Sequence, residues 1–381
     1  MKKLFSLILV LSLVLGMGLA YAEDSIKIGL ITFGMTNPIY TEGFINSGKL
    51  VAAQYNNNGG LLGKQVEIID ADGGNTADEA INAANMLLSR GDISAVYGCP
   101  TTIMAMGCEM LFAEAEVPLL MGGTSVKLHD ETDNMYLFRC RPSDAISARI
   151  AASMLVEQLG VTSLGVIYEN SDFGQGAFRI FEEYAKEKNV PIIGEGFNPT
   201  DQDVTSQVLK LKEAGITGCL VWANAYNVAM ISSALYNQGV SVPVCGNGGT
   251  CSADVQKSCQ PEWIDGWYGL ADVCITKDDE DIKNFIEAYK EAYGQDVYYD
   301  DTFCTAYSEV SWICDAITRA GTPDPKAVRD ALYATEGFKG LTGEFKLRGD
   351  KVDFAGTVDI IRQVIQDGEI VLVYDRTISV D

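Results

Sequence analysis

The sequences SIKIGLITF at residues 25–33 and QVEIID at residues 65–70 decide the fold, because a helical pattern at residues 43–56 separates them. Both stretches are rich in β-branched and apolar residues, which is typical of buried strands. Two strands joined through a helix form a βαβ unit, in which the strands lie parallel in one sheet. We therefore expect an α/β protein with helices on both faces of a mostly parallel sheet.

The same alternation continues to residue 121 and restarts after Arg141. Before that point we expect helices at 76–90 and 102–114, with strands at 95–97 and 118–121. After it we expect helices at 145–159, 175–188, 204–214 and 226–238, with strands at 163–168, 191–196, 218–222 and 242–245. Further helices are predicted at 279–293, 305–320 and 324–333, and strands at 357–363 and 369–374. Two units of similar size predict two doubly wound lobes with a ligand cleft between them.

The composition narrows the classes of function. The chain has 381 residues, with 52 Asp or Glu against 28 Lys or Arg, so its formal net charge is −24. Nucleic-acid binding depends on a basic surface, and this balance argues against it. His129 is the single histidine, which leaves little for a Ser-His-Asp triad or a histidine metal site. No phosphate-binding loop or GxSxG motif occurs, and Asp70 and Asp72 lack a third ligand, so no enzyme activity, cofactor or metal is predicted.

Residues 1–22 have the features of a secretory signal peptide. Lys2 and Lys3 precede an apolar run at residues 4–15, and Ala20-Tyr21-Ala22 provides a small-x-small cleavage site. The run is shorter than the roughly 20 apolar residues of a membrane-spanning helix. We therefore expect cleavage after Ala22 and a soluble protein exported to the periplasm.

Ten cysteines remain in that exported chain, and an oxidising compartment allows disulfides. None forms a CxxC pair, which argues against zinc-ribbon and thioredoxin-like sites. Cys251 and Cys259 flank a polar loop and are the candidate disulfide. Four others lie in apolar sequence and are expected to be buried thiols: Cys99, Cys219, Cys304 and Cys314.

Two strand-to-helix junctions carry small and hydroxyl-bearing residues. Tyr97-Gly98-Cys99-Pro100-Thr101-Thr102 leads from a strand into a helix, and Gly122-Gly123-Thr124-Ser125 follows the next strand. Unpaired amides at a helix N-terminus bind anions, including carboxylates. The alternative is that Thr101 or Thr102 only caps its helix. If the two junctions converge, their amides and hydroxyls form a site for one carboxylate.

The sequence NNGGLLGKQVEIIDAD at residues 57–72 resembles the N-A-x-G-G-I-x-G-K-x-L/V-E-L-x-x-x-D segment of the periplasmic leucine/isoleucine/valine-binding proteins, the type I solute-binding components of ABC importers. Motifs at 97–102, 122–124, 171–176 and 306–307 follow in that family's order and spacing. The resemblance implies a type I periplasmic binding protein, whose two lobes are joined by three crossovers and close on a ligand like a hinged trap. The lobes are expected at 24–142 plus 273–350 and at 143–272 plus 351–381.

The resemblance also implies a ligand site made by both lobes. Its carboxylate subsite falls on Thr102, beside Thr101, and the Gly122 backbone and Thr124 help to fix an α-amino acid head. Aromatic residues line the pocket in the family, and the matching positions, which ordinary lobe core also explains, are Phe173, Tyr226 and, more weakly, Tyr40.

One position departs from the family pattern. Amino-acid binders of the family carry a Glu that pairs with the ligand ammonium, whereas this chain has Asn247 in the stretch Cys245-Gly246-Asn247-Gly248. A buried ammonium without a carboxylate partner is costly. Either another acid provides the charge, with Asp300 or Asp301 as candidates, or the ligand lacks an amine. Trp222 and Asn224 suit a planar or amide-bearing ligand, although a Trp at a strand end is also common in cores.

The sequence thus predicts a monomeric, non-enzymatic solute-binding protein. It is expected to capture a small carboxylate, an amino acid of branched-chain type or an analogue, and to deliver it to an ABC transporter permease. Two alternatives remain open: a sensor that presents its ligand to a signalling receptor, and a binder of aromatic or 2-oxo acids.

Overall fold

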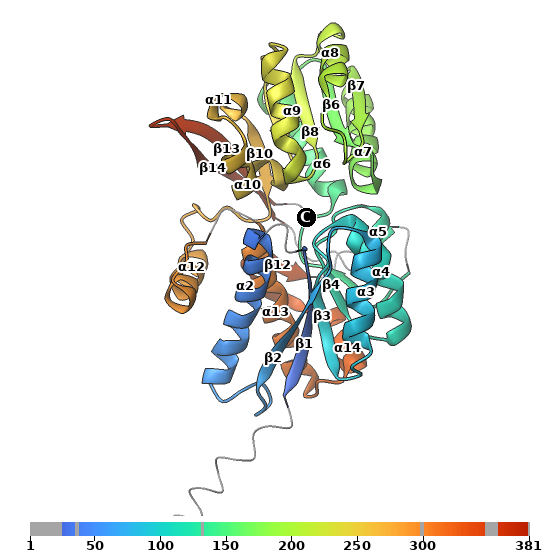
Figure 1. The fold of residues 1–381 in the computed structure, drawn as a ribbon, viewed down its shortest axis with the longest axis vertical. Helices are drawn as coiled ribbons and strands as arrows, with labels where there is room; N and C mark the ends of the chain where they lie inside the picture. The colour runs from blue at the N-terminus through green and yellow to red at the C-terminus, as the bar shows by residue number, and fades with distance from the viewer. Residues whose placement is uncertain (1–24, 35–37, 131–132, 298–300, 347–356, 380–381) are drawn as a thin grey trace, which may run out of the picture.

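The computed structural model describes residues 25–34, 38–130, 133–297, 301–346 and 357–379, which form two lobes stacked along the long axis of the molecule (Figure 1). The predicted signal peptide lies outside these residues. Among the helices that are described, none combines the length and the apolar character needed to cross a bilayer.

The first lobe is built on a five-stranded parallel sheet with the order β2-β1-β3-β4-β5. The interior strand β1 buries almost every residue, as expected where helices cover both faces. The strands are β1 (Ile26–Thr32), β2 (Val66–Asp72), β3 (Ile93–Gly98), β4 (Leu119–Met121) and β5 (Leu137–Arg139). One face packs against α2 (Pro38–Asn57), α13 (Asp301–Ala320) and α14 (Pro325–Tyr333), and the other against α3 (Ala77–Leu88) and α4 (Thr102–Ala115).

The second lobe contains a seven-stranded sheet with the order β14-β13-β10-β9-β8-β6-β7. Five strands are parallel: β6 (Leu164–Glu169), β7 (Ile192–Phe197), β8 (Gly218–Trp222), β9 (Val244–Gly246) and β10 (Tyr268–Ala271). Two more extend the sheet antiparallel: β13 (Thr357–Gln366) and β14 (Glu369–Ser379). One face packs against α6 (Asp144–Ser153) and α7 (Asp172–Lys188), and the other against α8 (Thr205–Glu213), α9 (Ala225–Asn237), α10 (Ala253–Ser258) and α11 (Pro261–Ile264).

The chain passes between the lobes three times. The first passage leads from β5 to α6, and the second leads from β10 to α12 (Glu280–Tyr293), which packs against α2 of the first lobe. The third follows the hairpin of β11 (Glu336–Gly340) and β12 (Gly343–Lys346), whose Phe345 lies in the core of the first lobe. The predicted class, two α/β lobes with parallel sheets joined by three crossovers, is confirmed.

The differences from the predicted elements have local causes. Helix α7 begins at Asp172 instead of residue 175, because Ser171 caps it by accepting a hydrogen bond from Gly174 N–H. The helix predicted at 145–159 ends its α-helical part at Ser153 and continues as a π-helix (Met154–Gln158). The elements that were not predicted are all short: β5, β10, β11, β12, α5 (Lys127–Asp130) and the 3₁₀ turn η2 (Gly248–Cys251) among them.

The disulfide predicted between Cys251 and Cys259 is not formed in the structure. Helix α10 separates the two residues, and each sulfur contacts a different neighbour. Cys259 Sγ lies 3.5 Å from Ser232 Oγ, whereas Cys251 Sγ packs so closely against β10 that it would lie 2.1 Å from a Cβ at Gly269. The four cysteines predicted to be buried thiols are buried in the structure.

Candidate functional site

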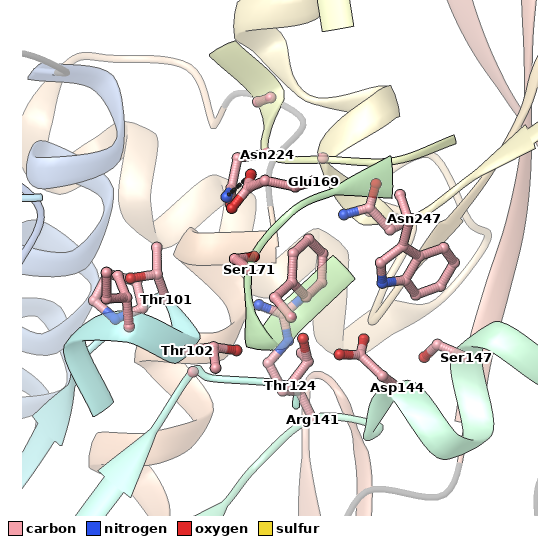
Figure 2. Close-up of a pocket in the computed structure, with 18 of the residues that line it drawn as sticks. Thr101, Thr102, Thr124, Arg141, Asp144, Ser147, Glu169, Ser171, Asn224 and Asn247 are labelled. Atoms are coloured by element: carbon pink, nitrogen blue, oxygen red, sulfur yellow. Dashed lines mark hydrogen bonds between the residues drawn. The ribbon is translucent and has the colours of Figure 1, made fainter. Parts of the chain in front are cut away.

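A cleft of about 1220 Å³ lies between the lobes, at the carboxyl ends of the strands of both sheets (Figure 2). Tyr40 and Asp301 belong to α2 and α13, but their side chains, and all of Asp300, fall outside the described residues. The other sequence-predicted ligand residues line this cleft: Thr101, Thr102, Gly122, Thr124, Phe173, Trp222, Tyr226 and Asn247.

The junction between β3 and α4 turns sharply before it enters the cleft. Gly98 has φ +112°, and a Cβ there would lie 2.2 Å from the carbonyl oxygen of Ile31, so the position requires glycine. Cys99 follows with φ 45°, and its N–H donates to the same Ile31 oxygen at 3.0 Å. This left-handed turn places Thr101 and Thr102 at the start of α4.

The start of α4 offers unpaired polar groups to the cleft. Thr101 is the N-cap residue, but its side chain makes no capping hydrogen bond. Its Oγ1 is buried and has no hydrogen-bond partner among the described residues. Thr102 Oγ1 accepts a hydrogen bond of 3.3 Å from Ser125 N–H, which links the two strand-to-helix junctions. The first turn of α4 carries no acidic residue, so its amides remain suited to an anion.

Gly122 allows the second junction to approach the first. A Cβ at Gly122 would lie 2.9 Å from Pro100 Cα, and Gly122 N–H donates to the Gly98 carbonyl oxygen at 3.0 Å. Thr124 follows, and its carbonyl oxygen accepts a hydrogen bond of 2.8 Å from Asp144 N–H. The two junctions therefore converge, as their sequences predict.

The second lobe contributes the aromatic surface. The Trp222 side chain is completely buried and packs edge-on against Phe181, with ring centroids 5.3 Å apart, while the Phe173 ring lies 6.2 Å away. Trp222 Nε1 lies close enough to Asp144 to favour the charged form of that carboxyl, but it makes no hydrogen bond of full geometry within the described part of the chain. Trp222 thus belongs to the core and also lines the cleft, whereas Tyr226 lies at the rim with 66% of its surface exposed.

Amide groups and one acid stand beside this aromatic surface. Asn247 Oδ1 is buried and lacks a hydrogen-bond partner among the residues described. Asn224 Nδ2 donates to Glu169 Oε2 at 2.7 Å, as the dashed line in Figure 2 shows. Glu169, which is 4% exposed, was not predicted from the sequence. Its place as the last residue of a parallel strand is the signal that points to it.

Asp144 is the second acid that sequence reasoning missed. It is the first residue of α6 and only 2% exposed, and its Oδ2 has no hydrogen-bond partner within the described residues. Burial raises the pKa of this carboxyl to about 7, although Arg139, the Thr124 hydroxyl, Arg141 and the Trp222 indole favour the charged form. In sequence, Asp144 looks like an ordinary acid in the first turn of a helix.

Two crossovers meet at the cleft through charged residues that line it. Arg141 Nε, in the first crossover, lies 2.7 Å from Asp272 Oδ2, in the second. Glu309 on α13 is completely buried, and neither carboxyl oxygen has a hydrogen-bond partner among the described residues. Burial raises the Glu309 pKa well above its usual range, with Arg141 opposing the rise and Asp272 adding to it. The hinge region therefore contains a buried carboxyl group that favours its protonated form.

The lobes also touch at one rim of the cleft. Ser125 Oγ donates to the carbonyl oxygen of Asp172 at 3.4 Å, and Lys127 forms an ion pair with the Asp172 carboxylate. Ser125 and Lys127 follow β4 of the first lobe, whereas Asp172 begins α7 of the second lobe. These contacts connect the two walls beside the binding groups.

Charge is divided unequally between the walls of the cleft. Among the described residues, the lining residues from the first lobe include several hydroxyls but no acid. All the acidic lining residues come from the second lobe or the second crossover: Asp144, Glu169, Asp172 and Asp272. In a chain with 52 acids, a wall without acidic side chains is well suited to a ligand carboxylate.

Two α/β lobes, three crossovers and a polar cleft between the lobes define a two-lobed solute-binding protein of the ABC transporter type. The chain belongs to the periplasmic binding protein family, whose model matches residues 25–368.

Individual relatives are distant but match over nearly full length. The leucine-, isoleucine-, valine-, threonine- and alanine-binding protein of Pseudomonas aeruginosa is 24% identical over 347 residues, which cover 88% of this chain and 90% of the relative. The branched-chain amino acid transporter substrate-binding protein of Streptococcus pneumoniae, solved with isoleucine, has a TM-score of 0.81 at 22% identity, covering 92% of this chain and 100% of that one. A Rhodopseudomonas palustris solute-binding protein, solved with 3,4-dihydroxybenzoic acid, has a TM-score of 0.80 at 19% identity, covering 94% and 98%.

Proposed function

We propose that this protein is exported, captures a small amino acid of branched-chain type or a close analogue, and delivers it to the permease of an ABC importer. It works as a monomer whose lobes close on the ligand. The observation that carries the proposal is the division of charge in the cleft, with an acid-free wall opposite a wall that holds buried acids. That division fits a zwitterion, with its carboxylate toward the first lobe and its ammonium toward the second.

The carboxylate end of the ligand is assigned to the first lobe. The uncapped amides of α4 and Thr101 Oγ1 are donors near one another, and hydrogen bonds to a charged group contribute about 1.5–3 kcal/mol each. Thr124 lines the same wall, where its hydroxyl favours the charged form of Asp144. Thr102 holds the two junctions together through Ser125 and lines the same wall.

The ammonium end of the ligand is assigned to Asp144. Asn247 leaves the expected carboxylate missing, but Asp144 is next to Thr124 and has an oxygen without a partner in the described part of the chain. An ammonium bound there stabilises the charged form of Asp144 and completes its hydrogen bonding. Glu169 adds negative charge on the same wall. Asp144 thus replaces Asp300 and Asp301 as the acid that we expect to compensate for Asn247.

A second ligand class has one observation in its favour. The Trp222 and Phe173 rings, with the Trp222 N–H unpaired among the described residues, suit a planar aromatic acid that bears a hydroxyl. The Rhodopseudomonas palustris relative was solved with such a ligand. A 2-oxo acid or a sensory role would use the same cleft, and finding permease genes beside this gene would favour transport over sensing.

A thermal-shift screen separates these ligand classes. The panel consists of branched-chain amino acids, their 2-oxo acids and hydroxybenzoates, with calorimetry on every compound that raises Tm. Ligand present at 100 times its Kd stabilises the folded state by about 2.7 kcal/mol, which is a clear shift in Tm. We expect the amino acids to raise Tm and the matched 2-oxo acids to raise it much less. Equal shifts for both would contradict the assigned ammonium site, and no shift with any carboxylate would contradict the proposed function.

A further inference from the structure

We propose that Cys99 and Cys108 form a disulfide in the exported protein, which ties the β3–α4 junction to the body of α4. This covalent link is independent of which ligand the cleft holds.

The two thiols are already in contact. Cys99 Sγ and Cys108 Sγ are 3.2 Å apart, and both side chains are completely buried. A disulfide has an S–S distance of about 2.05 Å, so a movement of roughly 1 Å brings the sulfurs into bonding range. Other cysteines contact oxygen atoms instead, such as Cys259 with Ser232 Oγ, Cys274 with Thr276 Oγ1 and Cys219 with the Leu220 carbonyl.

The backbone explains why this pair meets although nine positions separate it. Cys99 has a left-handed conformation with φ 45°, and its N–H is fixed to the Ile31 carbonyl oxygen. Cys108 lies on the inner face of α4, where its thiol also donates to the Met104 carbonyl oxygen at 3.1 Å. The segment that a 99–108 bond closes contains Thr101 and Thr102. The bond therefore restrains the part of the cleft that we assign to the ligand carboxylate.

The chemistry requires an external disulfide, the class of oxidant that thiol–disulfide exchange uses in oxidising compartments. One cysteine thiolate attacks that disulfide and releases one thiol. The second cysteine then attacks the mixed disulfide and releases the other thiol. The protein loses two protons and two electrons, and the external disulfide is reduced to two thiols. The hydrogen bond with the Cys108 thiol and, after it, burial raise the Cys99 pKa, so exchange occurs while the chain folds, and the finished bond is shielded.

Peptide mapping tests the bond directly. The full chain is produced in the oxidising periplasm of a bacterial host, denatured with iodoacetamide and cleaved with cyanogen bromide. Cleavage after Met86, Met104, Met106 and Met110 separates Cys99, in fragment 87–104, from Cys108, in fragment 107–110. We expect these two fragments to be detected as one disulfide-linked species, which separates into two masses on reduction. Recovery of both fragments alkylated, or either one joined to another cysteine such as Cys251 or Cys259, would overturn the proposal.

A second measurement does not depend on the mapping chemistry. The oxidised protein and protein refolded in a phosphine reductant are compared by thermal unfolding. A bond that closes a segment of about ten residues raises Tm by roughly 4 °C in a chain of this size. The Cys108→Ala variant is the control, because its Tm should not respond to the reductant. If reduction changes Tm equally in the wild type and the variant, the proposal is overturned. If the variant does not fold, the peptide map alone tests the proposal.

Discussion

The two walls of the cleft differ in charge and in the groups that they offer to a ligand. The first lobe offers hydroxyls and the N-terminus of α4, with no acid among its described lining residues, whereas the second lobe offers aromatic rings, amides and the buried acids Asp144 and Glu169. The first wall stabilises negative charge with neutral dipoles, and the second compensates positive charge with carboxylates. If the ligand is the zwitterion that we propose, its binding requires both walls and so couples the ligand to closure of the two lobes.

The electrostatic field at the first wall of the cleft differs from the field of the molecule as a whole. The net charge of −24 repels anions from the molecule as a whole. We therefore expect a carboxylate to bind where backbone amides and hydroxyls are present without acidic side chains, as at the β3–α4 junction. Two substitutions that each alter one wall, a change of pH and a substitution of a buried acid outside both walls test this difference, in order of decreasing expected effect.

Asp144→Asn removes the charge that we assign to the ligand ammonium. Truncating one partner of a buried charge pair costs about 2–5 kcal/mol, so calorimetry should show a Kd for an amino-acid ligand that is higher by roughly a hundredfold. Asp172→Asn is the matched control, because this acid lines the same wall but is 41% exposed and paired with Lys127. Equal losses in the two variants would remove the special role of Asp144.

Thr102→Ala weakens the opposite wall. Loss of the hydroxyl frees Ser125 N–H and loosens the two junctions, and we expect Kd to rise by about tenfold to a hundredfold. Thr205→Ala is a suitable control, since Thr205 is also the first residue of its helix, α8, and lies outside the cleft. Folding should remain nearly intact in both variants. Unchanged affinity in Thr102→Ala would contradict the carboxylate assignment.

The pH dependence of affinity distinguishes the two ligand classes by its sign. The Asp144 pKa is about 7 in the empty cleft, so an ammonium ligand must bind the ionised form, and its affinity should fall about tenfold from pH 8 to pH 6. A ligand with a carboxylate and no amine prefers protonated Asp144, and its affinity should rise over the same interval. Glu309, in the hinge region, also has a raised pKa. The change of affinity with pH is therefore assigned to Asp144 only if it disappears in the Asp144→Asn variant.

Glu309→Gln tests the buried acid below both walls and should leave affinity nearly unchanged. A raised pKa means that the folded protein holds the proton more tightly than the unfolded chain does. The stabilising contribution of Glu309 is therefore complete below the usual carboxyl pKa and is lost as pH rises toward the folded-state pKa. We expect Tm of the wild type to decline more steeply between pH 5 and pH 8 than Tm of the variant. Parallel curves would show that Glu309 does not contribute.

Several features were predictable because they depend on neighbouring residues in the chain. Hydrophobic periodicity located β1, β2 and the long helices, and the Gly-rich junctions indicated where loops leave the sheets. Strands β5 and β10, with three and four residues, were not predicted because so short a stretch carries little periodicity, although β4 and β9 of similar length were predicted. Helix α13 starts at Asp301, four residues before its predicted start, which shows how weakly periodicity defines a helix end.

The α/β class, the two lobes, the family resemblance and several of the residues that line the cleft follow from the sequence alone. Only the tertiary structure decided which acid faces Thr124, which wall lacks acids and which thiols meet. Asp144 and Trp222 are 78 positions apart, and the Cys99–Cys108 contact depends on a left-handed turn held by Ile31 from another strand. Such contacts follow from long-range packing and desolvation, which no local pattern of residues encodes.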